Sequence, residues 1–305
     1  MGDDTGQVVC EHLTKIYGHS KNRALDSVSF SLPSRGIFVL IGRNGSGKTT
    51  LVRILATELE PTSGSATING IDVVKEARIL REKIAIVPQE ARPMPWMSPM
   101  QTVQSYLLWR GFDYGEAKRR AFRALERLGI NESSRSLNRS LSGGMKRKVM
   151  VAAVLASEAE VIFLDEPTTG LDPISRKEFW ETLREIGKER FTFLTTHYLE
   201  EAEQLADQIG ILDHGNLIRL GSLEELRKSV NYNYSMRLLT SPQPLPPLEK
   251  GEIVVGIEGN VRILTVEEEA FRLSRELTKG GFKFTINPVS LDDIFFYLAS
   301  RKGDK

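Results

Sequence analysis

The feature that most constrains the fold is an apolar run that leads directly into a glycine-rich loop. The run Ile37–Ile41 is typical of a buried β-strand, and residues Gly42–Thr49 (Gly-Arg-Asn-Gly-Ser-Gly-Lys-Thr) fit the phosphate-loop pattern. Glycines let backbone N–H groups turn inward toward phosphate oxygens, and a helix that begins near Lys48 adds the positive end of its dipole. A glycine-rich turn that fits by chance is the alternative, and the preceding strand argues against it. The stretch therefore predicts a strand, a loop and a helix that bind nucleotide phosphates.

Residue types in this loop suit contact with phosphate oxygens and a metal ion. Lys48 is expected to reach the β- and γ-phosphates, and the Thr49 hydroxyl to bind Mg²⁺. The remaining contacts to the nucleotide are expected from Gly42, Arg43, Asn44, Gly45, Ser46, Gly47 and Thr50.

A pair of acids ends a second apolar run, Val161–Leu164. Asp165 suits a second contact to Mg²⁺, direct or through water, and Glu166 is a candidate general base for an attacking water. Taken alone, two adjacent acids at a strand end are ordinary residues. Behind a phosphate loop, the pair favours hydrolysis of a nucleotide.

A five-residue run, Leu141-Ser142-Gly143-Gly144-Met145, lies between the phosphate loop and the acid pair. Ser142 is well placed to cap the helix expected over residues 145–157. Gly143 and Gly144 leave backbone N–H groups uncovered at the start of that helix, which makes a second anion site. A glycine-containing helix start is common in any protein, so the weight rests on the order of the three motifs.

In that order the motifs resemble the ATP-binding cassette family, the engines of ABC transporters. The resemblance covers about residues 8–221 and implies an ATP hydrolase that uses ATP and Mg²⁺. It implies that Glu166 is the catalytic glutamate, and that Gln89 senses the metal and the attacking water. It also implies that His197 contacts the γ-phosphate and that Tyr17 stacks on adenine.

The resemblance further implies that one chain does not complete a site. In the family, the run at Ser142–Gly144 closes over the γ-phosphate bound to a second cassette in a head-to-tail dimer. Asp172 resembles the loop residue that couples the two sites across that dimer. Met145 stands where the family often has Gln, a departure that the four preceding residues make tolerable. The expected partner is a second cassette, either the same chain or a close paralogue.

Short β-rich runs that alternate with helical patterns predict an α/β fold with a largely parallel sheet. The expected core strands are Ile37–Ile41, Lys83–Val87, Val161–Leu164 and Phe191–Leu194. Together with the resemblance, this predicts a P-loop NTPase cassette with a mostly parallel core sheet, an antiparallel β part and a helical insertion.

Two domains are expected. Residues 1–229 form the ATP-binding domain, with the helical insertion at about 90–138. This insertion is entered through a Pro- and Met-rich loop, Ala91–Met100, and continues as a helix over Tyr114–Leu128. A proline-rich link, Ser241–Pro247, leads into a small α+β accessory domain over residues 230–305. Its expected strands are Glu252–Ile257, Val261–Val266 and Phe282–Ile286, and its expected helices are Glu267–Lys279 and Leu291–Arg301.

Composition limits what this engine drives. The 305 residues carry a net charge of +1, which gives no electrostatic reason to expect a nucleic-acid partner. No apolar run approaches the roughly 18 residues of a membrane helix, so a pore is expected in separate transmembrane permease subunits. The chain is therefore expected in the cytoplasm, held peripherally on the inner membrane face by that permease.

Two further segments bear on the direction of transport. The runs Thr168–Pro173 and Pro288–Phe295 resemble cassettes of the drug- and antibiotic-exporter type, which favours export of drug-like or lipophilic substrates over import of sugars or amino acids. The alternative function is a soluble or signalling ABC-type ATPase that does not transport.

Overall fold

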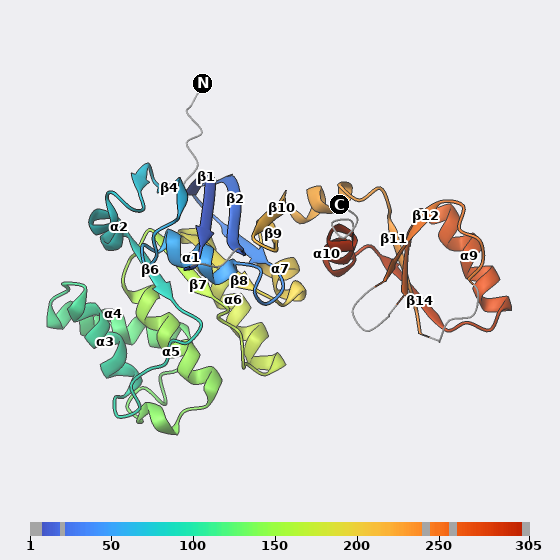
Figure 1. Cartoon of the computed structure of the whole chain (residues 1–305). Helices are drawn as coiled ribbons and strands as arrows, with labels where there is room; N and C mark the ends of the chain where they lie inside the picture. The colour runs from blue at the N-terminus through green and yellow to red at the C-terminus, as the bar shows by residue number, and fades with distance from the viewer. Residues whose placement is uncertain (1–7, 19–21, 240–244, 256–260, 301–305) are drawn as a thin grey trace. The chain divides into compact units, whose positions relative to one another are not determined.

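The computed structural model describes residues 8–18, 22–239, 245–255 and 261–300, and the chain divides into two compact units, Met1–Leu217 and Ile218–Lys305 (Figure 1). The division falls ahead of the expected boundary after residue 229. Helix α8 (Leu223–Lys228) packs against α10 (Leu291–Ser300), and both belong to the second unit.

A six-stranded sheet forms the centre of the first unit, in the order β10-β9-β3-β8-β7-β6. Strand β3 pairs in parallel with β8 and β9, and β7 pairs in parallel with β6 and β8. Every residue of β3, β7 and β8 is buried, as expected for strands covered on both faces. The four expected core strands are confirmed. The bounds are β3 (Ile37–Ile41), β6 (Ile84–Val87), β7 (Val161–Asp165), β8 (Phe191–Thr196), β9 (Gln208–Asp213) and β10 (Asn216–Gly221).

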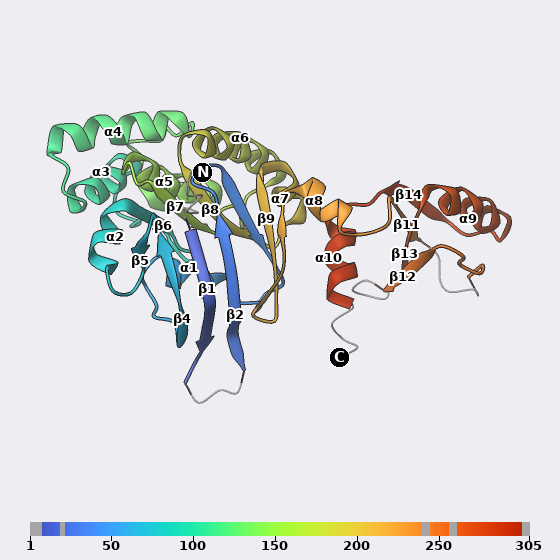
Figure 2. The ribbon, with the colours of Figure 1, turned by 90° about the horizontal axis from the view of Figure 1, so that it is seen from above.

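A second, antiparallel sheet supplies the expected antiparallel part, in the order β2-β1-β4-β5. Figure 1 and Figure 2 both show β1, β2 and β4 side by side next to α1. The strands are β1 (Val8–Ile16), β2 (Arg23–Leu32), β4 (Ser63–Ile68) and β5 (Ile71–Asp72). The helices that accompany the two sheets are α1 (Lys48–Leu55), α2 (Ala77–Lys83), α6 (Pro173–Glu189) and α7 (Leu199–Leu205).

The helical insertion contains α3 (Pro99–Trp109) and α4 (Tyr114–Arg127), which pack on each other and on α5 (Gly143–Ala156), with a short 3₁₀ turn at Asn138–Ser140 (Figure 2). The expectation of a loop through Met100 was wrong for its last two residues. Ser98 caps α3 and Gln101 completes a capping box, and proline is well tolerated at the first helical position.

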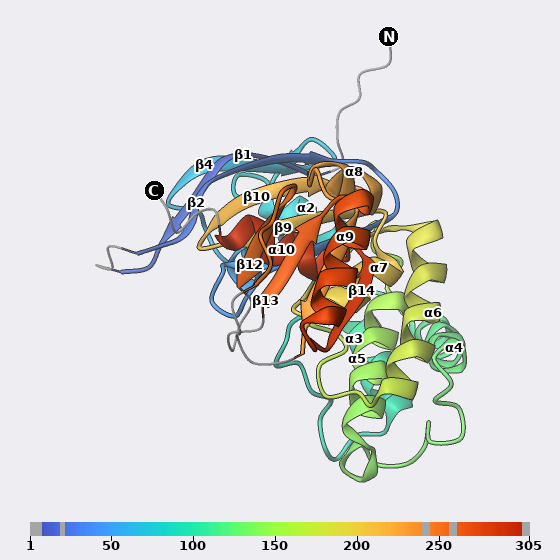
Figure 3. The ribbon, with the colours of Figure 1, turned by 90° about the vertical axis from the view of Figure 1, so that its right-hand side faces the viewer.

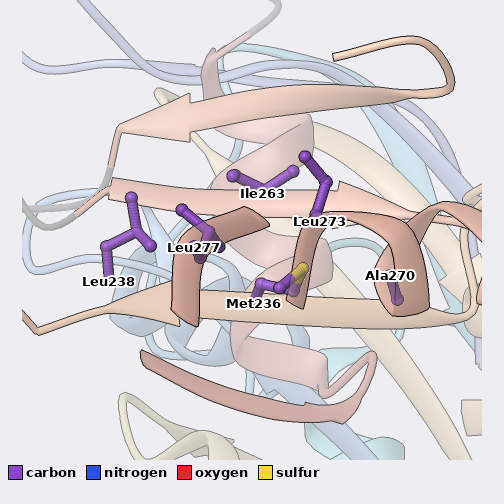
Figure 4. Close-up of a cluster of buried hydrophobic side chains, with 6 residues drawn as sticks. All are labelled: Met236, Leu238, Ile263, Ala270, Leu273 and Leu277. Carbon is purple, nitrogen blue, oxygen red and sulfur yellow. The ribbon is translucent and has the colours of Figure 1, made fainter. Parts of the chain in front are cut away.

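The second unit is a four-stranded antiparallel sheet in the order β12-β13-β11-β14, with α9 (Glu267–Lys279) on one face (Figure 3). Side chains of β11, β13 and α9 form its core, namely Met236, Leu238, Ile263, Ala270, Leu273 and Leu277 (Figure 4). The strands are β11 (Tyr234–Leu238), β12 (Gly251–Val255), β13 (Val261–Thr265) and β14 (Phe284–Pro288).

The sequence did not predict β11, which lies between β13 and β14 in this sheet. Residues 241–244 of the expected proline-rich link, residues 256–257 of an expected strand and Arg301 of an expected helix lie outside the described residues. Within the described ranges, no helix is both long and apolar enough to span a bilayer.

Candidate nucleotide-binding and hydrolysis site

The phosphate loop connects β3 to α1, and two of its glycines have no room for a side chain. A Cβ on Gly47, whose φ is +108°, would lie 2.3 Å from the Ala24 carbonyl oxygen, and one on Gly42 would lie 2.3 Å from that of Leu212. Gly47 is also the N-cap of α1 and offers no side chain to the first-turn N–H groups. Those donors therefore remain open to an anion.

Lys48 is the first residue of α1, and its side chain is buried in the loop. Its Nζ donates to the carbonyls of Gly42 (2.8 Å) and Arg43 (3.2 Å) and lies 3.8 Å from Glu166 Oε1. Burial lowers the pKa of the Lys48 ammonium, and the carboxylates of Glu166 and Asp165 offset part of that effect. Because the Glu166 carboxylate is 3.8 Å away, the buried Lys48 ammonium is only partly neutralised and is suited to bind the phosphates of a nucleotide.

Glu166 follows β7 and holds a left-handed backbone conformation, with φ +47°. Its Oε2 accepts from Gln89 Nε2 and Thr169 Oγ1, both at 3.2 Å, and lies 3.2 Å from His197 Nδ1. Its backbone N–H donates to both the carbonyl and the hydroxyl oxygen of Thr195. Three loops therefore meet at one carboxylate oxygen, while Oε1 faces Lys48.

Asp165 is 2% exposed and accepts a hydrogen bond from the Thr195 hydroxyl. Among the described residues, no group of three or more His, Cys, Asp or Glu is arranged to hold a metal ion. A Mg²⁺ held here would use the hydroxyl of Thr49 and the carboxylate of Asp165, with phosphate and water oxygens completing its shell. The donor set fits a metal that arrives with its nucleotide.

A cavity of about 500 Å³ is lined by half of the expected site residues. Its phosphate-loop lining comprises Asn44, Gly45, Gly47, Lys48, Thr49 and Thr50, and its opposite wall comprises Gln89, Glu166, Thr169 and His197. The buried Ser46 hydroxyl of the loop has no hydrogen-bond partner among the described residues, so it can still bind an oxygen of a ligand. Tyr17 is 43% exposed, and its hydroxyl lies 3.3 Å from that of Thr50. These observations fit ATP with Mg²⁺.

The second anion site predicted from the sequence is outside this cavity. Ser142 caps α5 by accepting from the Met145 N–H, and neither Gly143 nor Gly144 lines the cavity. Asp172 is also outside it and caps α6, where hydrogen bonds from Ser175 and Ile174 hold the pKa of its carboxyl below the usual range.

The run and the loop before α6 are nevertheless neighbours. A Cβ on Gly144 would lie 2.8 Å from Leu171 Cδ2, so the helix start packs tightly on that loop.

Sequence reasoning missed three residues of the site. Thr169 and Thr195 bind the two acids through their hydroxyls, and a threonine in or beside an apolar strand carries no distinctive signal. Arg147 is buried beside the acid pair. In the sequence it is one of three consecutive basic residues, Lys146–Lys148, and nothing distinguishes it from its neighbours.

Comparisons with known proteins agree with this geometry. The protein-family model for ABC transporters matches residues 25–169 of the chain. The chain is 32% identical to the daunorubicin/doxorubicin resistance ATP-binding protein DrrA of Streptomyces peucetius, over 96% of this chain and 92% of that one. It is 40% identical to the doxorubicin resistance ATP-binding protein DrrA of Mycobacterium tuberculosis, over 74% and 69%.

Solved structures show the same fold. The structure of CbiO1 from Clostridium perfringens, described as part of the ABC transporter complex CbiONQ, superposes with a TM-score of 0.66 at 28% identity, over 74% of this chain and 95% of that one. A dimeric post-hydrolysis structure of the ATP-binding cassette MJ0796 bound to ADP and Pi superposes with a TM-score of 0.65 at 24% identity, over 71% and 98%.

Proposed function

Because the chain belongs to the ABC transporter family as an ATP-binding protein, we propose that it powers a separate permease that exports drug-like or lipophilic compounds. The relatives that are similar over two thirds or more of their length include proteins named for daunorubicin and doxorubicin resistance. Their names supply the substrate class for this proposal.

The reaction is transfer of the ATP γ-phosphoryl group to water, which depends on positioning and charge neutralisation. Lys48 and the open N–H groups of α1 hold the phosphates. Thr49 and Asp165 would hold Mg²⁺, which would supply positive charge beside the phosphate oxygens. Glu166 takes the proton of the attacking water at Oε1, since its Oε2 is occupied by donors and Oε1 is 3.8 Å from Lys48.

His197 and Gln89 complete this arrangement at the γ-phosphate side. Both side chains line the cavity and contact Glu166 at 3.2 Å. The meeting of Gln89, His197 and the Glu166 carboxylate opposite the phosphate loop is the single observation that carries the catalytic assignment.

The unit that hydrolyses ATP contains two cassettes, as a homodimer or with a close paralogue. Ser142, Gly143 and Gly144 stand at the start of α5 and do not line the cavity of their own chain, and Gly144 packs on Leu171, the residue before Asp172. They close on ATP bound by the other cassette, where Tyr17 of that cassette stacks on adenine. ATP then joins the two cassettes and hydrolysis releases them.

Glu166→Gln tests the base. We expect hydrolysis to fall at least about a hundredfold, whereas ATP-driven dimerisation in size-exclusion chromatography persists because the amide keeps the shape of the carboxylate. Lys148→Gln is the control, since Lys148 pairs with Glu178 and does not line the cavity. Normal turnover by Glu166→Gln would sink the assignment of the base.

The permease contact is proposed at the loop before α3. Trp96 is 68% exposed and Met94 52% exposed, and large apolar side chains anchor interfaces. This contact holds the chain on the cytoplasmic face of the membrane.

Trp96→Ala tests that contact in cells that also produce the permease. Efflux of a fluorescent anthracycline should fall while the ATPase activity of the isolated chain stays unchanged. Trp109→Ala, on an 82% exposed residue at the end of α3, is the matched control. A chain that never co-purifies with membranes would instead favour a soluble or signalling ATPase.

The second unit is proposed to support the dimer as an accessory domain. Deletion of residues 231–305 should weaken ATP-dependent dimerisation without removing ATP binding. Unchanged dimerisation would point to a role toward the permease or substrate.

A further inference from the structure

Arg147, on α5, is a buried cation whose five described hydrogen bonds all go to main-chain carbonyls. Arg147 is 4% exposed to solvent. Its Nε donates to one carbonyl, and Nη1 and Nη2 donate to two each, over distances of 2.6–3.2 Å. The acceptors are Pro88 and Gln89 in one segment, and Asp165, Glu166 and Pro167 in the other.

The charge of Arg147 is expensive to bury, and within the described residues no carboxylate forms a direct ion pair with it. Burial lowers the pKa of the guanidinium to about 10, with Arg92 acting in the same direction and Asp165 opposing it. The group therefore remains charged at neutral pH. Charged donors form strong hydrogen bonds to carbonyl dipoles, and the planar fork of arginine reaches several acceptors in fixed directions.

The carbonyls that it binds belong to the two loops that supply the catalytic side chains. Gln89 Nε2 and Glu166 Oε2 are themselves 3.2 Å apart, and that contact survives only if both backbones hold their positions. The backbone of Glu166 has φ +47°, a conformation that costs free energy for a residue with a Cβ and needs support from its surroundings.

We propose that Arg147 is a positioning residue that holds the Gln89 loop and the Glu166 loop in the geometry required for hydrolysis. This inference rests on the proposed function of Glu166 as the base. Arg147 lies on the helix that begins at the Ser142–Gly144 run, about one turn further on. A shift of α5 on contact with a partner cassette would therefore move Arg147, and through Arg147 it would move the Glu166 loop of the same chain.

Two substitutions separate positioning from charge. Arg147→Gln removes the charge and most donors, and Arg147→Lys keeps the charge on one nitrogen that cannot span both segments. We expect kcat for ATP to fall at least about tenfold in Arg147→Gln and severalfold in Arg147→Lys, with KM within about threefold, because the phosphate loop is untouched. A rise in KM as large as the fall in kcat would contradict the proposal.

Arg190→Gln is the matched control. Arg190 is also partly buried, donates to the Leu155 carbonyl and has its pKa lowered by burial, but it does not contact either loop. Its variant should keep both kcat and KM. A loss of kcat as large as that of Arg147→Gln would mean that any such arginine matters only for the fold.

A double-mutant cycle with Glu166→Gln gives a readout that a general structural role would not move. If Arg147 acts through the base, Arg147→Gln should reduce the single-turnover rate of the Glu166→Gln protein by less than twofold. A further tenfold loss in that background would overturn the proposal, as would failure of both Arg147 variants to fold. Absence of ATP hydrolysis by the unmodified chain with its permease would instead overturn the proposed function.

Discussion

Two of the buried charged groups in the described part of the chain are built differently. In the second unit, Arg262 Nη1 lies 2.8 Å from Asp293 and 2.6 Å from Asp292, and Arg237 lies 3.1 Å from Asp292. In the first unit, Lys48 lies 3.8 Å from its carboxylate partner. Short ion pairs neutralise the Arg262 group of the second unit, which we call the closed group. The Lys48 group of the first unit leaves its cation available for a ligand, and we call it the open group.

The difference teaches that burial of charge does not mark a functional site by itself. Asp293 also accepts from the N–H and hydroxyl of Ser290 at the start of α10, so its oxygens are used by the fold. In the first unit, Glu166 has a left-handed backbone, and its carboxylate contacts Gln89, Thr169 and His197, which line one cavity together with the phosphate loop. These additional signs, and not charge, identify the place where chemistry occurs.

Lys48→Met breaks the open group and should give the largest effect. We expect kcat/KM for ATP to fall at least about a thousandfold, or about 4 kcal/mol, because a charge aimed at the phosphates is lost. Stability without nucleotide should stay equal or rise, since a poorly paired buried ammonium is replaced by an apolar chain of similar length. Steady-state kinetics and thermal unfolding measure the two quantities.

A marked fall in melting temperature for Lys48→Met would contradict the comparison, because it would make Lys48 as structural as the paired charges of the second unit. Addition of ATP and Mg²⁺ provides the control. It should raise the melting temperature of the unmodified protein and not that of the variant.

Asp293→Ala breaks the closed group and should act on stability alone. Removal of one partner leaves Arg262 buried beside a single remaining acid, so the second unit should lose about 3 kcal/mol. Hydrogen exchange of β11 and β13 amides in the full chain measures this local loss. The double variant Arg262→Met/Asp293→Leu should recover part of it, and a loss equal to the sum of both single variants would contradict the pairing.

The sequence predicted the elements whose local pattern is strong. The apolar runs at β3, β7 and β8, the phosphate loop and α9 all appear where composition and turn signals placed them. It missed β11, although the run Tyr-Ser-Met-Arg-Leu alternates apolar and polar side chains as a half-buried strand does. The run is only five residues long, and its partners β13 and β14 are distant in the sequence.

The sequence could not predict the site residues that act through main-chain carbonyls or through the pairing of neighbouring strands. Arg147 binds carbonyls that carry no side-chain signal, and Thr195 reaches Asp165 only because β7 and β8 pair in register at those residues. The motif Pro288–Phe295 was interpreted through resemblance, and its acids turn out to bind arginines from β11 and β13.

Acid titration sharpens the comparison through the carboxylates of the second unit. Hydrogen bonds from Arg272 lower the pKa of Glu269 to about 2. Burial would raise the pKa of Asp293, but hydrogen bonds from Ser290 and Arg262 lower it. A folded-state pKa below the unfolded one gives stability that is present above about pH 4 and lost as pH falls toward 2.

Exchange of the β13 amides, corrected for the intrinsic pH dependence, should therefore accelerate from about pH 4.5 downward. Glu269→Gln is the control, since its group no longer titrates and its curve should flatten. An unchanged slope in that variant would assign the acid sensitivity to other carboxylates.

Thr195→Val should give the smallest effect and tests how far the open group depends on its supports. The substitution removes the hydroxyl that donates to Asp165 and accepts from the Glu166 N–H, while the shape and burial of the side chain stay nearly constant. A single hydrogen bond contributes about 0.5–1.5 kcal/mol, so kcat should fall roughly three- to tenfold. The apparent affinity for Mg²⁺ should weaken as well, because Asp165 gains rotational freedom. Thr192→Val, three residues earlier on the same buried strand and with a hydroxyl that has no partner, should leave both quantities unchanged. Equal effects from the two valines would mean that the sheet, and not the Asp165 contact, is what the substitution disturbs.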